Sequence, residues 1–149
     1  MLEESLIADL VTELPVAVRL ERLVVTLKMH FGCQAVALLQ LEQGALKPIA
    51  FSGLVEEVRG RRFTISQHPR LVQLMETRQI VHFPPDPNLP DPYDGLIESQ
   101  LGQQLAVHDC MGVSLYVEGN CWGVLTLDAL SSGTFSRLTV LELQRFSLL

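Results

Sequence analysis

Residues 108–129 read HDCMGVSLYVEGNCWGVLTLDA, and this stretch decides the fold. Apolar residues alternate with other residues in both of its halves, which is the pattern of two half-buried strands. A one-residue slip turns every side chain to the other face, so the two apolar faces coincide only if the connection has an odd number of residues. We therefore predict strands over 108–117 and 121–129, joined by the three-residue loop Glu118-Gly119-Asn120.

The predicted register gathers chemically active residues at one end of this hairpin. Cys110 lies directly opposite Asp128, with Cβ atoms about 4.5–5.5 Å apart, and His108 lies on the same face two residues before Cys110. Thiolate, carboxylate and imidazole groups at such separations can share one metal ion. The spacing leaves a structural alternative open, because a strand cysteine is usually a core residue and an aspartate after a strand usually caps a turn. Farther along the same face, Trp122 and Tyr116 are expected to pair as packing residues.

The rest of the chain combines helical patterns with short strands. A helix is expected to follow Pro15, which suits a first turn, and to end at Gly32, which suits a helix C-terminus. Further helices are expected at 3–14, 69–77 and 136–149, strands at 34–41, 46–51, 62–65 and 80–83, and a loop at 84–95. This order predicts an α+β domain with an antiparallel sheet flanked by helices.

Length and composition narrow the classes of function. The 149 residues fit one domain with one core. A formal net charge of -6 with scattered Lys and Arg argues against direct nucleic acid contact. We expect a cytoplasmic domain that does not enter a membrane, because no apolar run reaches the length of a span and the N-terminus lacks a basic signal region. The last predicted helix ends on Leu148-Leu149, which suggests a piece of a longer protein.

Leu89-Pro90-Asp91-Pro92-Tyr93-Asp94-Gly95 is a stiff acidic loop. Its carboxylates, Asp91 and Asp94, suit a cation that prefers oxygen or mixed ligands, although aspartates in turns often only accept backbone hydrogen bonds. Arg70, near the start of the helix predicted at 69–77, is able to hold a carboxylate or to donate to a bound diatomic molecule. Its position alone favours an exposed arginine.

Five stretches together carry a resemblance to a known family. They are Gly60-Arg61-Arg62-Phe63, His68-Pro69-Arg70-Leu71, Leu89 through Ile97, Val107-His108 with Cys110 and Gly112, and Gly123 with Leu125-Thr126-Leu127-Asp128. On these stretches the sequence resembles the GAF sensor domains of NorR-type regulators, a family of nitric-oxide-responsive bacterial transcription regulators. The resemblance covers most of the chain. It implies the GAF fold, in which an antiparallel sheet has helices on one side and a ligand pocket on the other.

The resemblance also implies a mononuclear Fe(II) site that binds nitric oxide. The family's site residues correspond in this sequence to Asp91, Asp94, His108, Cys110 and Asp128, with Arg70 beside the iron. It implies further an AAA+ ATPase domain and a helix-turn-helix domain in the longer protein, where the GAF domain represses the ATPase until nitric oxide arrives. Glu76 is a departure, because some family members have an arginine there in the contact that represses the ATPase.

Three alternatives from other classes stay open. An enzyme that reduces free methionine sulfoxide would need cysteines with Cα atoms within about 7 Å. Cys33 is instead predicted at a helix–strand junction, and Cys121 on the face of the hairpin opposite to Cys110. A GAF domain that binds an organic effector would need an aromatic-lined pocket. A dimerisation module is the third, and the amphipathic terminal helices favour a homodimer under every interpretation. We therefore predict a regulatory sensor domain and not an enzyme.

Overall fold

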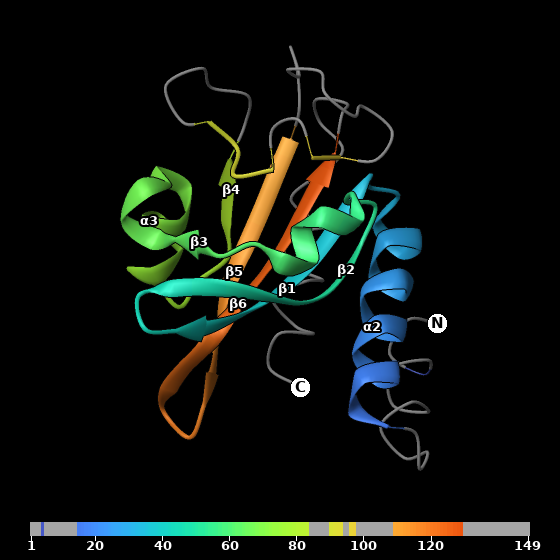
Figure 1. Cartoon of the computed structure of the whole chain (residues 1–149), viewed down its shortest axis with the longest axis horizontal. Helices are drawn as coiled ribbons and strands as arrows, with labels where there is room; N and C mark the ends of the chain where they lie inside the picture. Colours follow the sequence, from blue (N-terminus) through green and yellow to red (C-terminus); the bar gives the residue numbers. More distant parts are fainter. Residues whose placement is uncertain (1–3, 5–14, 84–89, 94–95, 98–108, 130–149) are drawn as a thin grey trace.

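The computed structural model describes residues 4, 15–83, 90–93, 96–97 and 109–129. Its main elements are, in chain order, α2 (Val16–Phe31), β1 (Ala35–Glu42), β2 (Ala45–Ser52), the 3-10 turns η1 (Glu56–Gly60) and η2 (Ile65–Gln67) on either side of β3 (Phe63–Thr64), α3 (Pro69–Met75), β4 (Val81–Phe83), β5 (Asp109–Val117) and β6 (Asn120–Ala129). The described strands form one antiparallel sheet in the order β3-β2-β1-β6-β5-β4 (Figure 1). This is the α+β arrangement that the sequence predicts.

The helices predicted at 3–14 and 136–149, and most of the loop predicted at 84–95, lie outside the described residues. Neither described helix has the length and apolar character that crossing a membrane requires. α2 begins directly after Pro15 and ends at Gly32, whose φ of 63° is the left-handed conformation that glycine adopts without a Cβ penalty. Both helix ends therefore confirm the sequence prediction.

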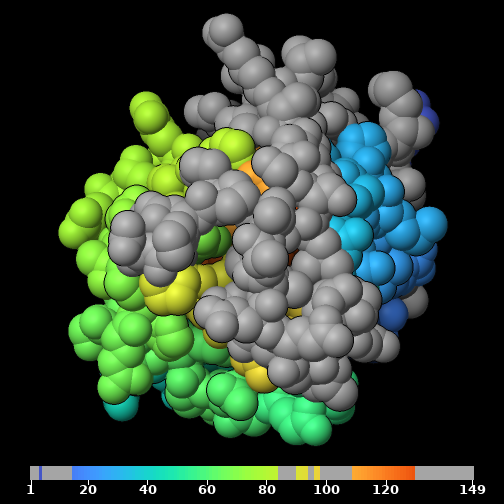
Figure 2. All heavy atoms as spheres, turned by 90° about the horizontal axis from the view of Figure 1, so that it is seen from above, coloured from blue at the N-terminus to red at the C-terminus, as the bar shows by residue number. Residues whose placement is uncertain are grey.

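The two faces of the sheet lie toward different helices, α2 (blue) on one side and α3 (green) on the other (Figures 1 and 2). α2 covers one face, where it forms the α2-side core: Val24, Leu27, Phe31, Cys33, Val36, Leu38, Ala50, Met111, Val113, Leu125, Leu127 and Ala129. α3 and neighbouring loops cover the other face, where they form the site-side core: Ala35, Ala37, Leu39, Leu46, Phe51, Leu54, Val58, Phe63, Leu71, Leu74, Phe83, Tyr93, Ile97, Cys110 and Val124. Strand alternation assigns neighbouring residues to opposite cores, as it does Met111 and Cys110.

The β5–β6 connection differs from the predicted three-residue loop. Val117 pairs with Asn120, so the turn has two residues, Glu118 and Gly119, with φ angles of 52° and 82°. Two consecutive positive φ angles are typical of the tight hairpin turn that matches strand twist. The register then shifts between Leu115 and Tyr116, because β6 has one extra residue at a β-bulge. The bulge supplies the residue that the turn lacks, and beyond it the predicted register is confirmed.

The bulge also overturns the predicted pairing of Trp122 with Tyr116. Tyr116 is opposite Cys121, and Leu115 is opposite Gly123, so Trp122 is the extra residue of β6. The Trp122 side chain packs against the α2-side core, whereas the Tyr116 ring lies 4.0 Å from the guanidinium carbon of Arg78. The expectation was wrong because an irregular residue loses the two-residue periodicity on which the pairing depended.

Candidate metal centre

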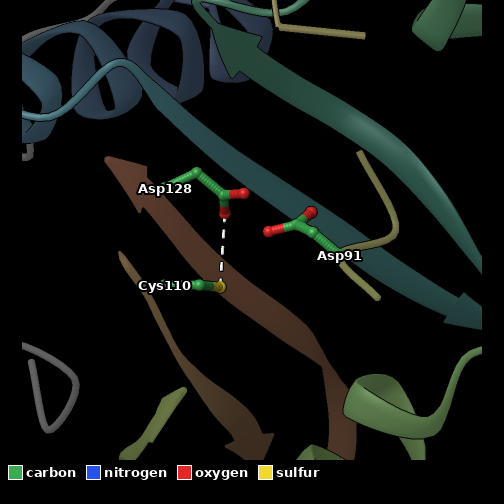
Figure 3. A group of neighbouring side chains, drawn as sticks. All are labelled: Asp91, Cys110 and Asp128. Atoms are coloured by element: carbon green, nitrogen blue, oxygen red, sulfur yellow. Dashed lines mark hydrogen bonds between the residues drawn. The ribbon is translucent and has the colours of Figure 1, made fainter. Parts of the chain in front are cut away.

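Three side chains with metal-binding atoms converge on the face of the sheet that carries the site-side core, where β5 begins and β6 ends. Asp91, Cys110 and Asp128 each offer one ligand atom, and these three atoms lie within 4.8 Å of one another. The side chains point toward a common centre, two from adjacent strands and one from the acidic loop (Figure 3). All three residues are buried. They are the cluster that the hairpin register and the family resemblance predict, without the two predicted residues outside the described part of the chain.

The strand register sets the geometry of two of these side chains. Cys110 pairs with Asp128 across β5 and β6, and the Cys110 Sγ donates to Asp128 Oδ1 at 3.3 Å. On the other side of β6, Asp128 pairs with Ala35 of β1, and its backbone carbonyl accepts the Gln34 amide at 2.9 Å. β6 is thus held between two strands at the residue that bears the carboxylate, so the backbone of Asp128 is rigidly placed.

Asp91 reaches the centre from a turn and not from a strand. Its Oδ1 accepts the backbone amide of Tyr93 at 2.7 Å, which is the local bond of an Asx turn. Its Oδ2 is 3.4 Å from the Nη1 of Arg70. The turn chemistry that the sequence suggested as an alternative is therefore present, and the same carboxylate also faces the cluster (Figure 3).

Arg70 is buried beside the cluster, and only 2% of its surface is exposed. Its guanidinium carbon lies 5.2 Å from the centre of the Phe83 ring, within the range of a cation–π interaction. The exposed arginine favoured by position alone is wrong, because this side of α3 faces the sheet, where Leu71 and Leu74 are also buried. Arg70 therefore lies next to Asp91, one of the residues that the resemblance gives as a metal ligand.

Burial and mutual repulsion govern the protonation of the cluster. Burial raises the pKa of the Asp128 carboxyl well above its usual range, and the neighbouring carboxylate of Asp91 raises it further. The pKa of the Cys110 thiol is also raised, first by burial and then by Asp128 and Asp91, while Arg70 acts in the opposite direction. Without a cation, both shifts favour the protonated forms of the Asp128 carboxyl and the Cys110 thiol.

The donor set fits a divalent cation. Metal binding would release the protons of these groups, and the ionised set of two carboxylates and one thiolate beside the guanidinium of Arg70 would have a net charge that a divalent cation balances. Among the described residues, nothing donates a hydrogen bond to the buried Oδ2 of Asp128. A buried polar atom without a partner is costly, and a metal ion is one partner able to satisfy it. Mixed sulfur and oxygen donors suit a first-row transition metal better than calcium or magnesium.

Two of the predicted ligands, Asp94 and His108, lie outside the described residues, so their prediction stays as the sequence made it. Sequence reasoning missed the contact between the Tyr93 hydroxyl and Thr126 Oγ1, 2.9 Å apart. It also missed the short contact between His82 Nε2 and the buried Asp109 Oδ1. A tyrosine within a polar loop was the available sign of the first contact, since a large aromatic residue tends to be buried.

The three cysteines are all free thiols and lie in different places. Cys33 belongs to the α2-side core and Cys110 to the site-side core, whereas Cys121 is half-buried near the β5–β6 turn. Burial raises the pKa of the Cys33 thiol to about 12, with a smaller contribution from Asp128. A thiol with such a pKa is almost wholly protonated at neutral pH and is a poor nucleophile.

Comparison with known proteins identifies the family. Residues 16–149 match the model of the GAF domain. The chain is 55% identical over 145 residues to the nitric oxide reductase transcription regulator NorR1 of Cupriavidus necator, which is 97% of this chain and 28% of that protein. It is 44% identical over 126 residues to the anaerobic nitric oxide reductase transcription regulator NorR of Salmonella arizonae, covering 85% of this chain and 24% of that protein. These relatives are named as transcription regulators and not as enzymes, in agreement with the prediction.

Solved structures show the same fold at low sequence identity. A GAF domain from a phosphoenolpyruvate-protein phosphotransferase of Coxiella burnetii matches with a TM-score of 0.77 at 16% identity, covering 99% of this chain and 86% of that one. A free methionine-R-sulfoxide reductase from Neisseria meningitidis matches with a TM-score of 0.73 at 16% identity, covering 99% and 81%. Identities this low establish the fold alone. On the family model and this fold, the chain belongs to the GAF domain family.

Proposed function

We propose that this domain is the sensor of a nitric-oxide-responsive transcription regulator, and that it binds nitric oxide at one Fe(II) ion. Asp91, Cys110 and Asp128 would hold the iron, together with the predicted ligands Asp94 and His108. The observation that carries this proposal is the buried cluster of two carboxylates and a thiol, whose three possible ligand atoms lie within 4.8 Å of one another beside Arg70. The chain that bears it is 55% identical to a nitric oxide reductase transcription regulator.

Ferrous iron would supply an open coordination position at which a neutral diatomic molecule binds without a proton. Residues of this chain would exclude water, fix the separation of the ligands and donate hydrogen bonds. Burial excludes water from the cluster, and the strand register keeps Cys110 and Asp128 at a fixed separation. Arg70 lies where it can take up a released carboxylate or donate to a bound diatomic molecule.

Arg70 also connects the cluster to α3, so a change at the cluster can affect this helix. Its guanidinium pairs with Asp91, and its backbone is in the first turn of α3. A change in the position of Asp91 would therefore act directly on this helix. We propose that the resulting change in α3 relieves repression of an AAA+ domain in the same polypeptide. This chain spans 28% of the length of NorR1, so the ATPase, the homodimer, the cytoplasmic location and the lack of DNA contact by this segment remain predictions.

Iron stoichiometry tests the ligand assignment. The chain is reconstituted anaerobically with Fe(II), freed of excess metal, and assayed with a colorimetric chelator. We expect one iron per chain, lost in Cys110→Ser and Asp128→Ala. Cys121→Ser is the matched control, because Cys121 is a free thiol far from the cluster near the β5–β6 turn. Equal iron in all four proteins would contradict the assignment.

A further inference from the structure

Asp91 is the member of the cluster that no strand positions. Cys110 and Asp128 are fixed by the pairing of β5 with β6, whereas Asp91 lies in a turn beside Tyr93. A ligand on a loop is accurately placed only if the loop itself is held. The bond from the Tyr93 amide to Asp91 Oδ1 is internal to the turn, so it shapes the turn but does not attach it to the sheet.

The Tyr93 side chain attaches the turn to β6, while Arg70 contacts Asp91 from α3 and the Val55 amide donates to the Leu96 carbonyl farther along the segment. Tyr93 is buried, with 2% of its surface exposed, and its ring packs edge-to-face on Phe63 with ring centres 5.5 Å apart. Its hydroxyl lies 2.9 Å from the Oγ1 of Thr126, which is itself buried. Thr126 precedes Asp128 by two residues, so both side chains lie on the same face of β6. The tyrosine therefore joins the loop to the strand that carries the facing carboxylate.

We propose that Tyr93 is a positioning residue of the metal centre, and that its bond to Thr126 sets the separation between Asp91 and Asp128. The inference rests on the proposed function, because it assigns Tyr93 a role toward the metal. A tyrosine suits this role: its ring is rigid, and it has one polar atom at its far end. Outer contacts that orient metal ligands typically change metal affinity by about 10–100-fold when they are removed.

Cobalt(II) binding by the full chain tests the proposal, since cobalt(II) has visible bands that report the geometry of its ligands. Tyr93→Phe removes one oxygen atom and keeps the ring, and Thr126→Val removes the partner hydroxyl. We expect each substitution to weaken Co(II) binding about tenfold and to shift the visible bands. The double variant should bind no more weakly than the weaker single variant, because both substitutions remove the same bond. Thr126→Ser, which keeps the hydroxyl, should restore the bands.

Tyr116→Phe is the matched control, because Tyr116 lies on the same sheet near the β5–β6 turn, away from the cluster. It should bind Co(II) as the wild type does. Wild-type affinity and bands in Tyr93→Phe, or additive losses in the double variant, would overturn the role of Tyr93 and leave the proposed function standing. Failure of the wild type itself to bind Co(II) and Fe(II) would overturn the proposed function and the metal-positioning role together.

A second readout needs no metal. In chelator-treated protein, the Tyr93 amide is protected by its bond to Asp91 Oδ1 only while the turn is held in place. Hydrogen exchange at this amide should therefore be faster in Tyr93→Phe, while exchange in β1 and β6 stays as in the wild type. Unchanged exchange at Tyr93 would show that the hydroxyl does not hold the loop, and would overturn the proposal.

Discussion

Replacing Asp128 by asparagine should stabilise the metal-free domain while it abolishes metal binding. In the absence of a cation, the Asp128 carboxyl is buried against Asp91, and its Oδ2 receives no hydrogen bond from the described residues. An asparagine keeps an oxygen that can accept from Cys110 and puts an N–H donor beside the Asp91 carboxylate. The asparagine amide has no ionisation cost, and a hydrogen bond to a charged group contributes about 1.5–3 kcal/mol, so we expect Asp128→Asn to increase the free energy of unfolding by about that amount at pH 7.5.

The free energy of unfolding should depend on pH in a direction that the pKa of Asp128 determines. An aspartate in the unfolded chain has a pKa of about 3.9, whereas burial raises the pKa of Asp128 in the folded domain. Below pH ~4 both states hold the neutral acid, so Asp128 costs the wild type nothing there through ionisation. As the pH rises above this value the unfolded state loses its proton first, and the wild type loses stability until the folded pKa is passed. Asparagine does not titrate, so its advantage should grow from pH 4.5 to pH 7.5.

Urea unfolding of chelator-treated protein at these two pH values measures the effect. For a domain of this size, about 1 kcal/mol corresponds to roughly 2–4 °C in melting temperature, so a thermal scan serves as a check. Asp109→Asn is the control, because Asp109 is also buried but pairs with His82. It should lose stability where Asp128→Asn gains it. A metal-free Asp128→Asn that is less stable than the wild type, by the same amount at both pH values, would refute the reasoning.

Three further predictions follow from the structure. Gly123→Ala should reduce the melting temperature sharply, because the added Cβ would lie 1.9 Å from the Leu39 carbonyl oxygen, whereas Gly60→Ala has no atom within 4 Å and should melt as the wild type does. Iodoacetamide at pH 8 should modify Cys121 before Cys33, whose pKa is raised to about 12, and peptide mass spectrometry showing the reverse order would contradict the assigned burial. Arg70→Ala should retain iron and lose the response to nitric oxide in a transcription reporter, and loss of the iron would contradict a reading role for Arg70.

Local signals in the sequence predict α2 and the hairpin of β5 and β6, which positions Cys110 and Asp128. Pro15 and Gly32 mark the ends of α2 because proline and glycine act through their own backbone preferences. The alternation in residues 108–129 predicted that Cys110 would face Asp128, and the structure confirms it. Such predictions succeed because strand alternation over eight or more residues depends little on the rest of the molecule.

Features that the local sequence pattern does not determine are predicted poorly. The hairpin turn was assigned three residues because the alternation fixes only whether the number of extra residues is odd or even, and a two-residue turn with a bulge gives the same register as a three-residue loop. Arg70 was expected to be exposed because nothing near it in the sequence shows that α3 turns this side to the sheet. The contact between Tyr93 and Thr126 joins residues 33 apart and has no local signature.

Electron paramagnetic resonance of the iron-loaded domain exposed to nitric oxide tests the central claim most directly. The sample is prepared anaerobically, and the spin concentration is compared with the iron and protein concentrations. We expect a high-spin signal of iron that carries nitric oxide, at one spin per chain, absent in Cys110→Ser and Asp128→Ala and present in Cys121→Ser. A chain that binds no iron, or a signal that both cluster substitutions leave unchanged, would contradict it.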